Sequence, residues 1–283
     1  MEAKVKEKEG LFMDKISEMK NLFDRWKLEQ ENEQEPCYTP GVVEKHYFTL
    51  DGFINKEKYD NADKKILFIL KEPHILEKRE KGIDDNQINW YMNYIEWLED
   101  TNTKRIKDSS YIRENVSRMS AYIIDKEIVS DRVRLKEALE SIAVININKR
   151  GGSGDCDTRE LYEKYYLKYK QFIIEQIQIC NPEIIISMCG HEIFEDLNKE
   201  FLDKNIKMVS LVHPARGKWI KIDDDEVDKG FRKTVKTEEI QNESIENKIR
   251  FLNENISRDI KFNKTTFKFF MQFVKRYTDK EIK

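Results

Sequence analysis

The run Lys65-Ile-Leu-Phe-Ile-Leu70 is short and apolar, and it is stopped by Pro73. These features suit a strand that is buried on both faces better than a helix. Three later runs, at 142–145, 184–188 and 208–212, have the same character, and helical segments separate them. The alternation predicts a parallel or mostly parallel sheet with helices on both sides.

The remaining segments are mostly helical in their apolar spacing. The further predicted elements are helices at 10–31, 87–99, 110–140, 159–179, 246–256 and 265–278 and a weak strand at 47–53. The acidic and polar region from 222 to about 248 indicates an irregular excursion. No internal repeat is present.

We therefore expect an α/β protein with a three-layer α/β/α core, a central four-stranded and mostly parallel sheet, and helical N- and C-terminal extensions. Residues 1–60 would form a helical and loop extension packed on the core, which would span 61–221. Residues 222–283 would add the charged excursion and the last helices to the same domain, because 283 residues suffice for one large core.

The composition supports a buried interior and a heavily charged exterior, with 39% hydrophobic and 37% charged residues. The formal charge of −3 does not indicate a polyanion partner, so any surface for nucleic acid must be local. The sequence has no apolar run of 18 residues, and MEAKVKEKEGLF lacks the apolar core of a signal peptide. We expect a cytoplasmic protein without membrane contact.

The cysteines do not form a metal-binding pattern. The four are Cys37, Cys156, Cys180 and Cys189, and no CxxC pair occurs among them, which disfavours a zinc ribbon. Their spacing also differs from that of iron–sulfur ligands. We expect reduced thiols, no metal and no cofactor.

Polar groups follow each of the four apolar runs. In open α/β sheets, ligands collect at the carboxyl ends of the strands, so these groups are the first candidates for a site. The runs lead into Lys71-Glu72-Pro73-His74, Asn146-Ile147-Asn148, Cys189-Gly190-His191 and His213-Pro214-Ala215.

These four motifs, in this order, resemble the uracil-DNA glycosylase superfamily. There, the first strand ends in a motif like G-Q-D-P-Y, the second in an asparagine, the third in W-G or C-G and the fourth in H-P-S. The resemblance covers about residues 64–220 and implies four parallel strands between helices and a site for one extruded base. Two features depart from the family. Arg216-Gly217-Lys218-Trp219 stands in place of a leucine wedge, and Asp84 and Asp85 provide no stacking aromatic.

The resemblance implies three catalytic residues. Glu72 would orient or deprotonate the water and stabilise an oxocarbenium-like sugar. His213 would donate a hydrogen bond to the departing base. Asn146 would recognise the base edge, a role that Asn148 could share. The structural alternatives are a surface carboxylate, a histidine that binds loop carbonyls and asparagines that bind their own loop.

The resemblance also places residues around the base and the DNA backbone. His74 would stand where the family has a bulkier side chain that excludes 5-substituted bases, and Gly190 belongs to the third motif. The predicted phosphate-binding residues are Lys149, Arg150, Gly152 and Ser153 in one glycine-rich loop and Arg216 and Lys218 in a second basic cluster. A flexible turn and simple packing remain the alternatives for the loop and for His74.

Three functions remain open. The leading hypothesis is a DNA N-glycosylase that removes uracil or a modified pyrimidine, such as a phage-modified base, in base excision, DNA repair or phage defence. The second is a non-catalytic reader of a modified base or nucleotide, with protein partners at its terminal helices. The third is a nucleoside or nucleotide hydrolase on the same sheet, which the acidic net charge favours.

Overall fold

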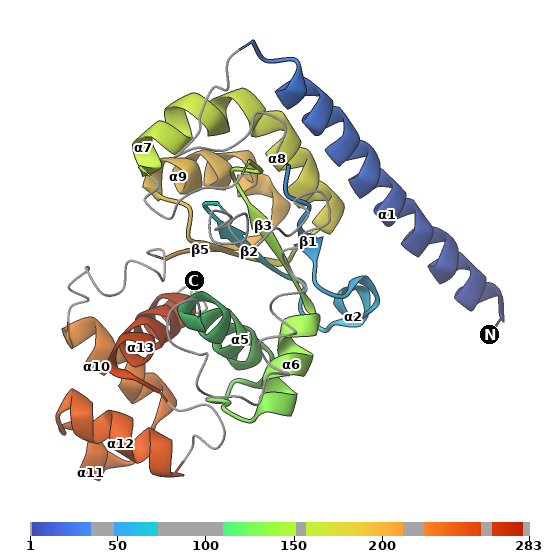
Figure 1. The fold of residues 1–283 in the computed structure, drawn as a ribbon. Coiled ribbons are helices and arrows are strands. Elements are labelled where there is room, and N and C mark those ends of the chain that lie inside the picture. Colours follow the sequence, from blue (N-terminus) through green and yellow to red (C-terminus); the bar gives the residue numbers. More distant parts are fainter. Residues whose placement is uncertain are drawn as a thin grey trace, which may run out of the picture.

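A computed structural model describes residues 2–34, 48–72, 110–150, 157–211, 224–255 and 262–279, with side chains from residue 15 and from residue 114 onward in the first and third ranges. The protein has an α/β fold around one five-stranded sheet (Figure 1). The strands are β1 (Gly52–Phe53), β2 (Ile66–Leu70), β3 (Ile142–Asn146), β4 (Ile184–Ser187) and β5 (Lys207–Ser210).

The sheet has the order β1-β3-β2-β4-β5 and is mostly parallel. β2 pairs in parallel with β3 and β4, and β4 pairs in parallel with β5. β1 pairs antiparallel with β3, with Gly52 opposite Val144. The predicted α/β class and parallel pairing are confirmed, but the sheet has one strand more than the four expected. The additional strand lies inside the weak strand predicted at 47–53.

The helices account for most of the remaining described chain. They are α1 (Glu2–Glu31), α2 (Lys56–Asn61), α5 (Ser110–Asp125), α6 (Arg132–Glu140), α7 (Thr158–Glu160), α8 (Leu167–Cys180), α9 (His191–Glu200), α10 (Asp224–Thr234), α11 (Glu238–Gln241), α12 (Ile245–Asn255) and α13 (Lys264–Asp279). A π-helical stretch, Leu161–Tyr166, joins α7 to α8, and a 3₁₀ turn, Leu202–Lys204, follows α9. The helix predicted at 87–99 lies outside the described residues.

The helical periodicity at 110–140 belongs to two helices. Lys126 takes a positive φ of 60° directly after α5, a conformation that stops a helix of L-residues. Asp131 then caps α6, because its side chain accepts hydrogen bonds from the main-chain N–H groups of Val133 and Arg134. The connection between α5 and α6 is therefore specified locally.

The irregular excursion predicted after residue 222 is wrong, because α10 and α11 occupy much of it. α10 begins with three acidic residues, which favour a helix N-terminus, and it buries Val227 and Phe231. It packs against α13 so closely that a Cβ at Gly230 would lie 2.1 Å from the carbonyl oxygen of Met271. A strongly charged segment can therefore form a helix when one narrow face is apolar and small.

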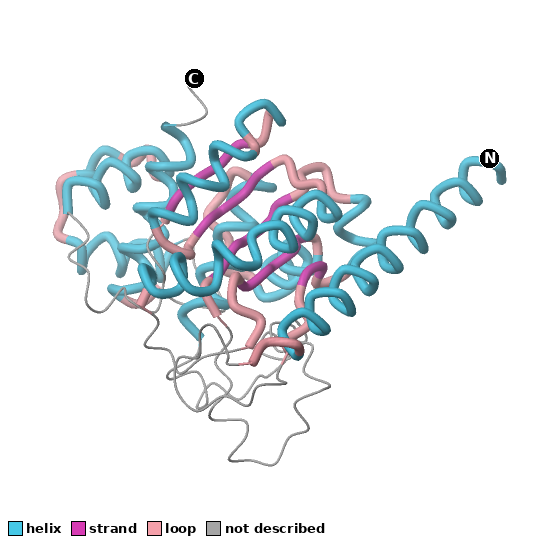
Figure 2. The backbone as a smooth tube through the Cα atoms, turned by 90° about the horizontal axis from the view of Figure 1, so that it is seen from above, coloured by secondary structure: helices cyan, strands magenta, loops and turns pink. Residues whose placement is uncertain are grey.

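Successive side chains of the sheet point into two separate apolar cores. Ile66 and Phe68 belong to a core with α5, α6, α10 and α13, whereas Leu67 and Ile69 belong to a core with α1, α8 and α9. Figure 1 shows these two groups of helices on either side of the sheet. The N-terminal end of α1 projects away from the body (Figure 2). The other end of α1 joins the body through Trp26, which stacks on Phe172 at 5.5 Å.

Candidate functional site

The polar residues that follow β2 and β3 lie at the same edge of the sheet. Leu70 and Asn146 are opposite each other at the ends of these strands. Main-chain pairing continues beyond them, since the N–H of Asn148 donates to the carbonyl of Lys71 at 2.8 Å. The predicted convergence of the first and second motifs is therefore present in the structure.

Glu72 and Asn148 form the centre of this edge. The Nδ2 of Asn148 lies 3.4 Å from Oε2 of Glu72. Asn148 is 0% exposed and Glu72 is 6% exposed. The Oδ1 of Asn148 accepts a hydrogen bond of 2.9 Å from the main-chain N–H of Arg150. Because that N–H can only donate, the amide group is oriented with its NH₂ toward the carboxylate.

Asn146 is held by Asp51, which immediately precedes β1. Oδ2 of Asp51 accepts hydrogen bonds from the main-chain N–H of Asn146 at 2.7 Å and from its Nδ2 at 3.2 Å. The Oδ1 of Asn146 is buried and has no hydrogen-bond partner in the described part of the chain. One half of this amide is thus bound to Asp51, and the oxygen of the other half is buried without a hydrogen bond from the described residues.

Lys149 is bound in the interior on the side of α1 and α8. Its ammonium group lies 2.6 Å from Oδ1 of Asp51, an oxygen that Gln176 of α8 also contacts at 2.8 Å. The ring of Trp26 lies 5.1 Å from the same ammonium group. Burial lowers the pKa of Lys149, and the negative charge of Asp51 opposes that effect.

Arg150 is bound by a second buried carboxylate, that of Glu33 after α1. Its guanidinium lies 2.5 Å from Oε2 of Glu33, while Oε1 accepts from Tyr169 at 2.5 Å and from Lys168. Burial alone would raise the pKa of Glu33, but the hydrogen bonds from Lys168 and Tyr169 and the charge of Arg150 lower it to about 2. The N-terminal extension is therefore joined to the loop after β3 by charge.

The expected phosphate contacts of Lys149 and Arg150 are contradicted by this arrangement. Both residues are 0% exposed, and each has its charge neutralised by a carboxylate. A phosphate would have to displace a buried carboxylate from each cation, and separating one partner of a buried pair costs about 3–5 kcal/mol. In the described structure these cations fix the loop instead of binding a DNA backbone.

Gly190, predicted to lie beside the base, occupies a position whose backbone conformation favours glycine. It precedes α9 as its N-cap and takes a φ of 117°, which L side chains rarely adopt. An added Cβ would approach the side chain of Thr158 to 3.2 Å. Its neighbour Cys189 and the more distant Cys180 are buried cysteines outside any disulfide, and Sγ of Cys189 lies 3.0 Å from Oγ of Ser187.

The other predicted site residues lie outside the described residues. They are His74, Gly152, Ser153, His213, Arg216 and Lys218. The structure thus unites Glu72, Asn146 and Asn148 at one edge, and the position of His213 relative to them stays a prediction.

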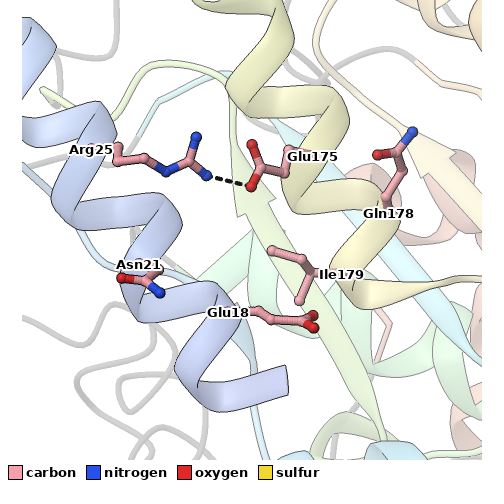
Figure 3. A pocket seen from close by; sticks show the side chains of 6 residues that line it. All are labelled: Glu18, Asn21, Arg25, Glu175, Gln178 and Ile179. Carbon is pink, nitrogen blue, oxygen red and sulfur yellow. Dashed lines mark hydrogen bonds and ion pairs between the residues drawn. The ribbon is translucent and has the colours of Figure 1, made fainter. Parts of the chain in front are cut away.

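A separate groove lies between α1 and α8, away from the strand ends (Figure 3). It has a volume of about 570 Å³, and Arg25 pairs with Glu175 across it. Its lining residues are Glu18, Asn21, Arg25, Glu175, Gln178 and Ile179. Of the predicted site residues that the structure describes, none lines this groove, so it does not support the same chemistry.

Neither a metal-binding cluster nor a membrane-spanning helix occurs in the described ranges. They contain no group of three or more His, Cys, Asp or Glu residues arranged to hold a metal ion. Among their helices, none combines the length and apolar character needed to cross a membrane.

Comparisons of the chain with protein-family models, characterised proteins and solved structures gave no match.

Sequence reasoning missed Asp51 and Glu33, the two carboxylates that organise the loop after β3. They lie 98 and 117 positions from their partners Lys149 and Arg150. A sequence signal existed only in part: two adjacent cations directly after a buried strand are candidates for internal ion pairs. No local pattern identifies which of the many acidic residues supply the partners.

Proposed function

We propose that this chain is a DNA N-glycosylase that hydrolyses the bond between deoxyribose and uracil or a modified pyrimidine. The base would be flipped to the carboxyl edge of β2 and β3, in a three-layer core of the uracil-DNA glycosylase type. The observation that carries the proposal is the buried contact between Glu72 and Asn148, with Asn146 at the end of the adjacent strand.

The pair suits the chemistry of N-glycoside hydrolysis. The sugar becomes positively charged as the bond to the base breaks, and a carboxylate near it stabilises that charge and orients the attacking water. A hydrogen bond from the NH₂ of Asn148 to Oε2 of Glu72 holds this carboxylate in one direction. Asn148 would thus be a positioning residue, and Glu72 the catalytic residue.

The remaining roles follow from the resemblance. Asn146 would recognise the base edge, and His213 would donate a hydrogen bond to the base as it leaves with negative charge. His74 and Gly190 would border the base. With Lys149 and Arg150 removed from the phosphate contacts, Gly152, Ser153, Arg216 and Lys218 would supply them, in a cytoplasmic protein that needs no cofactor.

A nucleoside or nucleotide hydrolase is the second candidate. The burial of Lys149 and Arg150 favours it, because two cations expected along a DNA strand are consumed inside the protein. Such an enzyme would use Glu72 and Asn146 in the same way on a free nucleoside.

A release assay tests both candidates. Purified protein is incubated with single-stranded and duplex DNA carrying uracil or phage-type modified pyrimidines, and separately with deoxyuridine, and free base is quantified by mass spectrometry. Release from DNA with strongly salt-dependent binding supports the glycosylase, because DNA binding releases counterions. Release from the nucleoside alone supports the second candidate, and absence of release from every substrate refutes both.

A further inference from the structure

The first observation concerns the direction of the Asn146 amide. Both of its hydrogen bonds to Asp51, from the main-chain N–H and from Nδ2, end on the same carboxylate oxygen. A carboxylate accepts hydrogen bonds and does not donate them. The NH₂ of Asn146 therefore faces Asp51, and its carbonyl oxygen faces away.

The second observation is that Asp51 is itself fixed. Its other oxygen receives the ammonium of Lys149 at 2.6 Å and Nε2 of Gln176 at 2.8 Å. Rotation of the carboxylate away from Asn146 would break a buried ion pair and an amide contact together. Such networks hold their members in one arrangement because each change leaves a buried group without a partner.

The third observation is the free acceptor that results. Asn146 is 1% exposed, and its Oδ1 has no hydrogen-bond partner in the described ranges. An unpaired buried polar group typically costs about 1–3 kcal/mol. A ligand that brings an N–H donor to this oxygen recovers that cost, whereas a ligand carbonyl at the same place would meet an acceptor and be repelled.

We infer that Asp51 is a positioning residue that fixes Asn146 as a hydrogen-bond acceptor, so that the site selects pyrimidines offering an N–H donor at this position. The inference rests on the proposed function, because it takes the ligand to be a base at the edge of β2 and β3. It adds a rule for specificity and assigns it to a residue outside the strand-end motifs.

Binding to matched probes tests the inference on the wild-type protein. Three single strands are used, each all adenine except for one central residue: deoxyuridine, N3-methyldeoxyuridine or deoxyribosyl-2-pyrimidinone. The second replaces the imide N–H with a methyl group, and the third has a bare ring nitrogen there, so only one of them adds bulk. Affinity is measured by fluorescence anisotropy against an all-adenine strand, and base release is recorded in parallel.

The inference predicts that deoxyuridine binds at least tenfold more tightly than either of the other probes. Smaller discrimination, or no binding beyond the all-adenine strand, overturns it. Base release is judged separately: discrimination without release supports the inference and excludes uracil as the base that a glycosylase would remove, whereas release with equal affinities overturns the inference and supports the glycosylase.

Two variants assign the discrimination to residues. Asp51→Asn allows the Asn146 amide to turn, because an amide at position 51 can donate as well as accept. The ratio of the affinity for the deoxyuridine strand to that for either other probe should therefore fall at least threefold. Asn146→Ala removes the acceptor and should abolish the ratio even if Asp51→Asn does not fold. Glu175→Gln is the matched control, because Glu175 is the neighbour of Gln176 on α8 but pairs with Arg25 at the surface, and its ratio should match wild type. A ratio unchanged in Asn146→Ala contradicts the inference.

Discussion

The substitution Glu33→Gln measures how strongly the N-terminal extension is joined to the site loop. The pKa of Glu33 is lowered from 4.5 to about 2 by Lys168, Tyr169 and Arg150, against the opposing effect of burial. Each pKa unit corresponds to about 1.4 kcal/mol, so the charged form of Glu33 stabilises the fold by about 3 kcal/mol. A glutamine keeps part of the hydrogen bonding, and the expected loss in the free energy of unfolding at pH 7 is about 2–3 kcal/mol.

The stabilisation by Glu33 should depend on pH. A carboxyl group with a lowered pKa contributes stability that is fully present above pH 4.5 and is lost as the pH falls toward 2. The difference between wild type and Glu33→Gln, measured by urea unfolding, should therefore be constant from pH 7 to about 5 and shrink below that. Glu175→Gln is the control, because its ion pair with Arg25 is exposed and should contribute less than about 1 kcal/mol. A Glu33→Gln loss no larger than the control, or one independent of pH, refutes the reasoning.

The remaining predictions concern packing and charge, and urea unfolding measures each. Gly230→Ala places a Cβ 2.1 Å from the carbonyl oxygen of Met271 and should destabilise by about 1–3 kcal/mol or more; an unchanged stability would contradict the close α10–α13 crossing. Trp26→Ala removes the buried ring between α1 and α8 and should cost about 3–5 kcal/mol, so a loss below 1 would mean that α1 does not pack there. Lys149→Met leaves the Asp51 carboxylate buried without its cation and should cost about 3–5 kcal/mol, and a neutral result would show that the pair is not buried.

The core of the sheet could be predicted because its strands are apolar throughout. Residues 66–70 and 142–146 are buried on both faces of the sheet. Each is therefore a short, continuous apolar run, which is the pattern of a strand in a parallel sheet. β1 has two residues and lies inside the weak strand predicted at 47–53, but its place in the sheet depends on its antiparallel pairing with β3, which no local pattern encodes. The segment that forms α10 was predicted to be irregular because it is strongly charged. Some of these charges form ion pairs with α13, such as that of Asp224 with Lys268, and the local sequence does not show that partner.

The site could be predicted in part, because the ends of the predicted strands position some of its residues. Glu72 and Asn148 follow directly on strands, so sheet geometry alone brings them together. Lys149 and Arg150 follow the same strand, but their direction depends on Asp51 and Glu33, which the chain supplies from its N-terminal segment. A cation in a loop is compatible with binding phosphate or a buried carboxylate, and tertiary structure decides between them.

The central claim is that the carboxylate at the end of β2 carries out hydrolysis of an N-glycosidic bond. The most direct measurement is the single-turnover rate of base release from uracil-containing DNA by wild type and Glu72→Gln, with DNA affinity measured on the same samples and Glu175→Gln as the control. A drop of about 10²–10⁴-fold in rate for Glu72→Gln, with affinity within a few-fold of wild type, is the predicted result. Equal rates in Glu72→Gln and wild type, or no release by wild type, would contradict the claim.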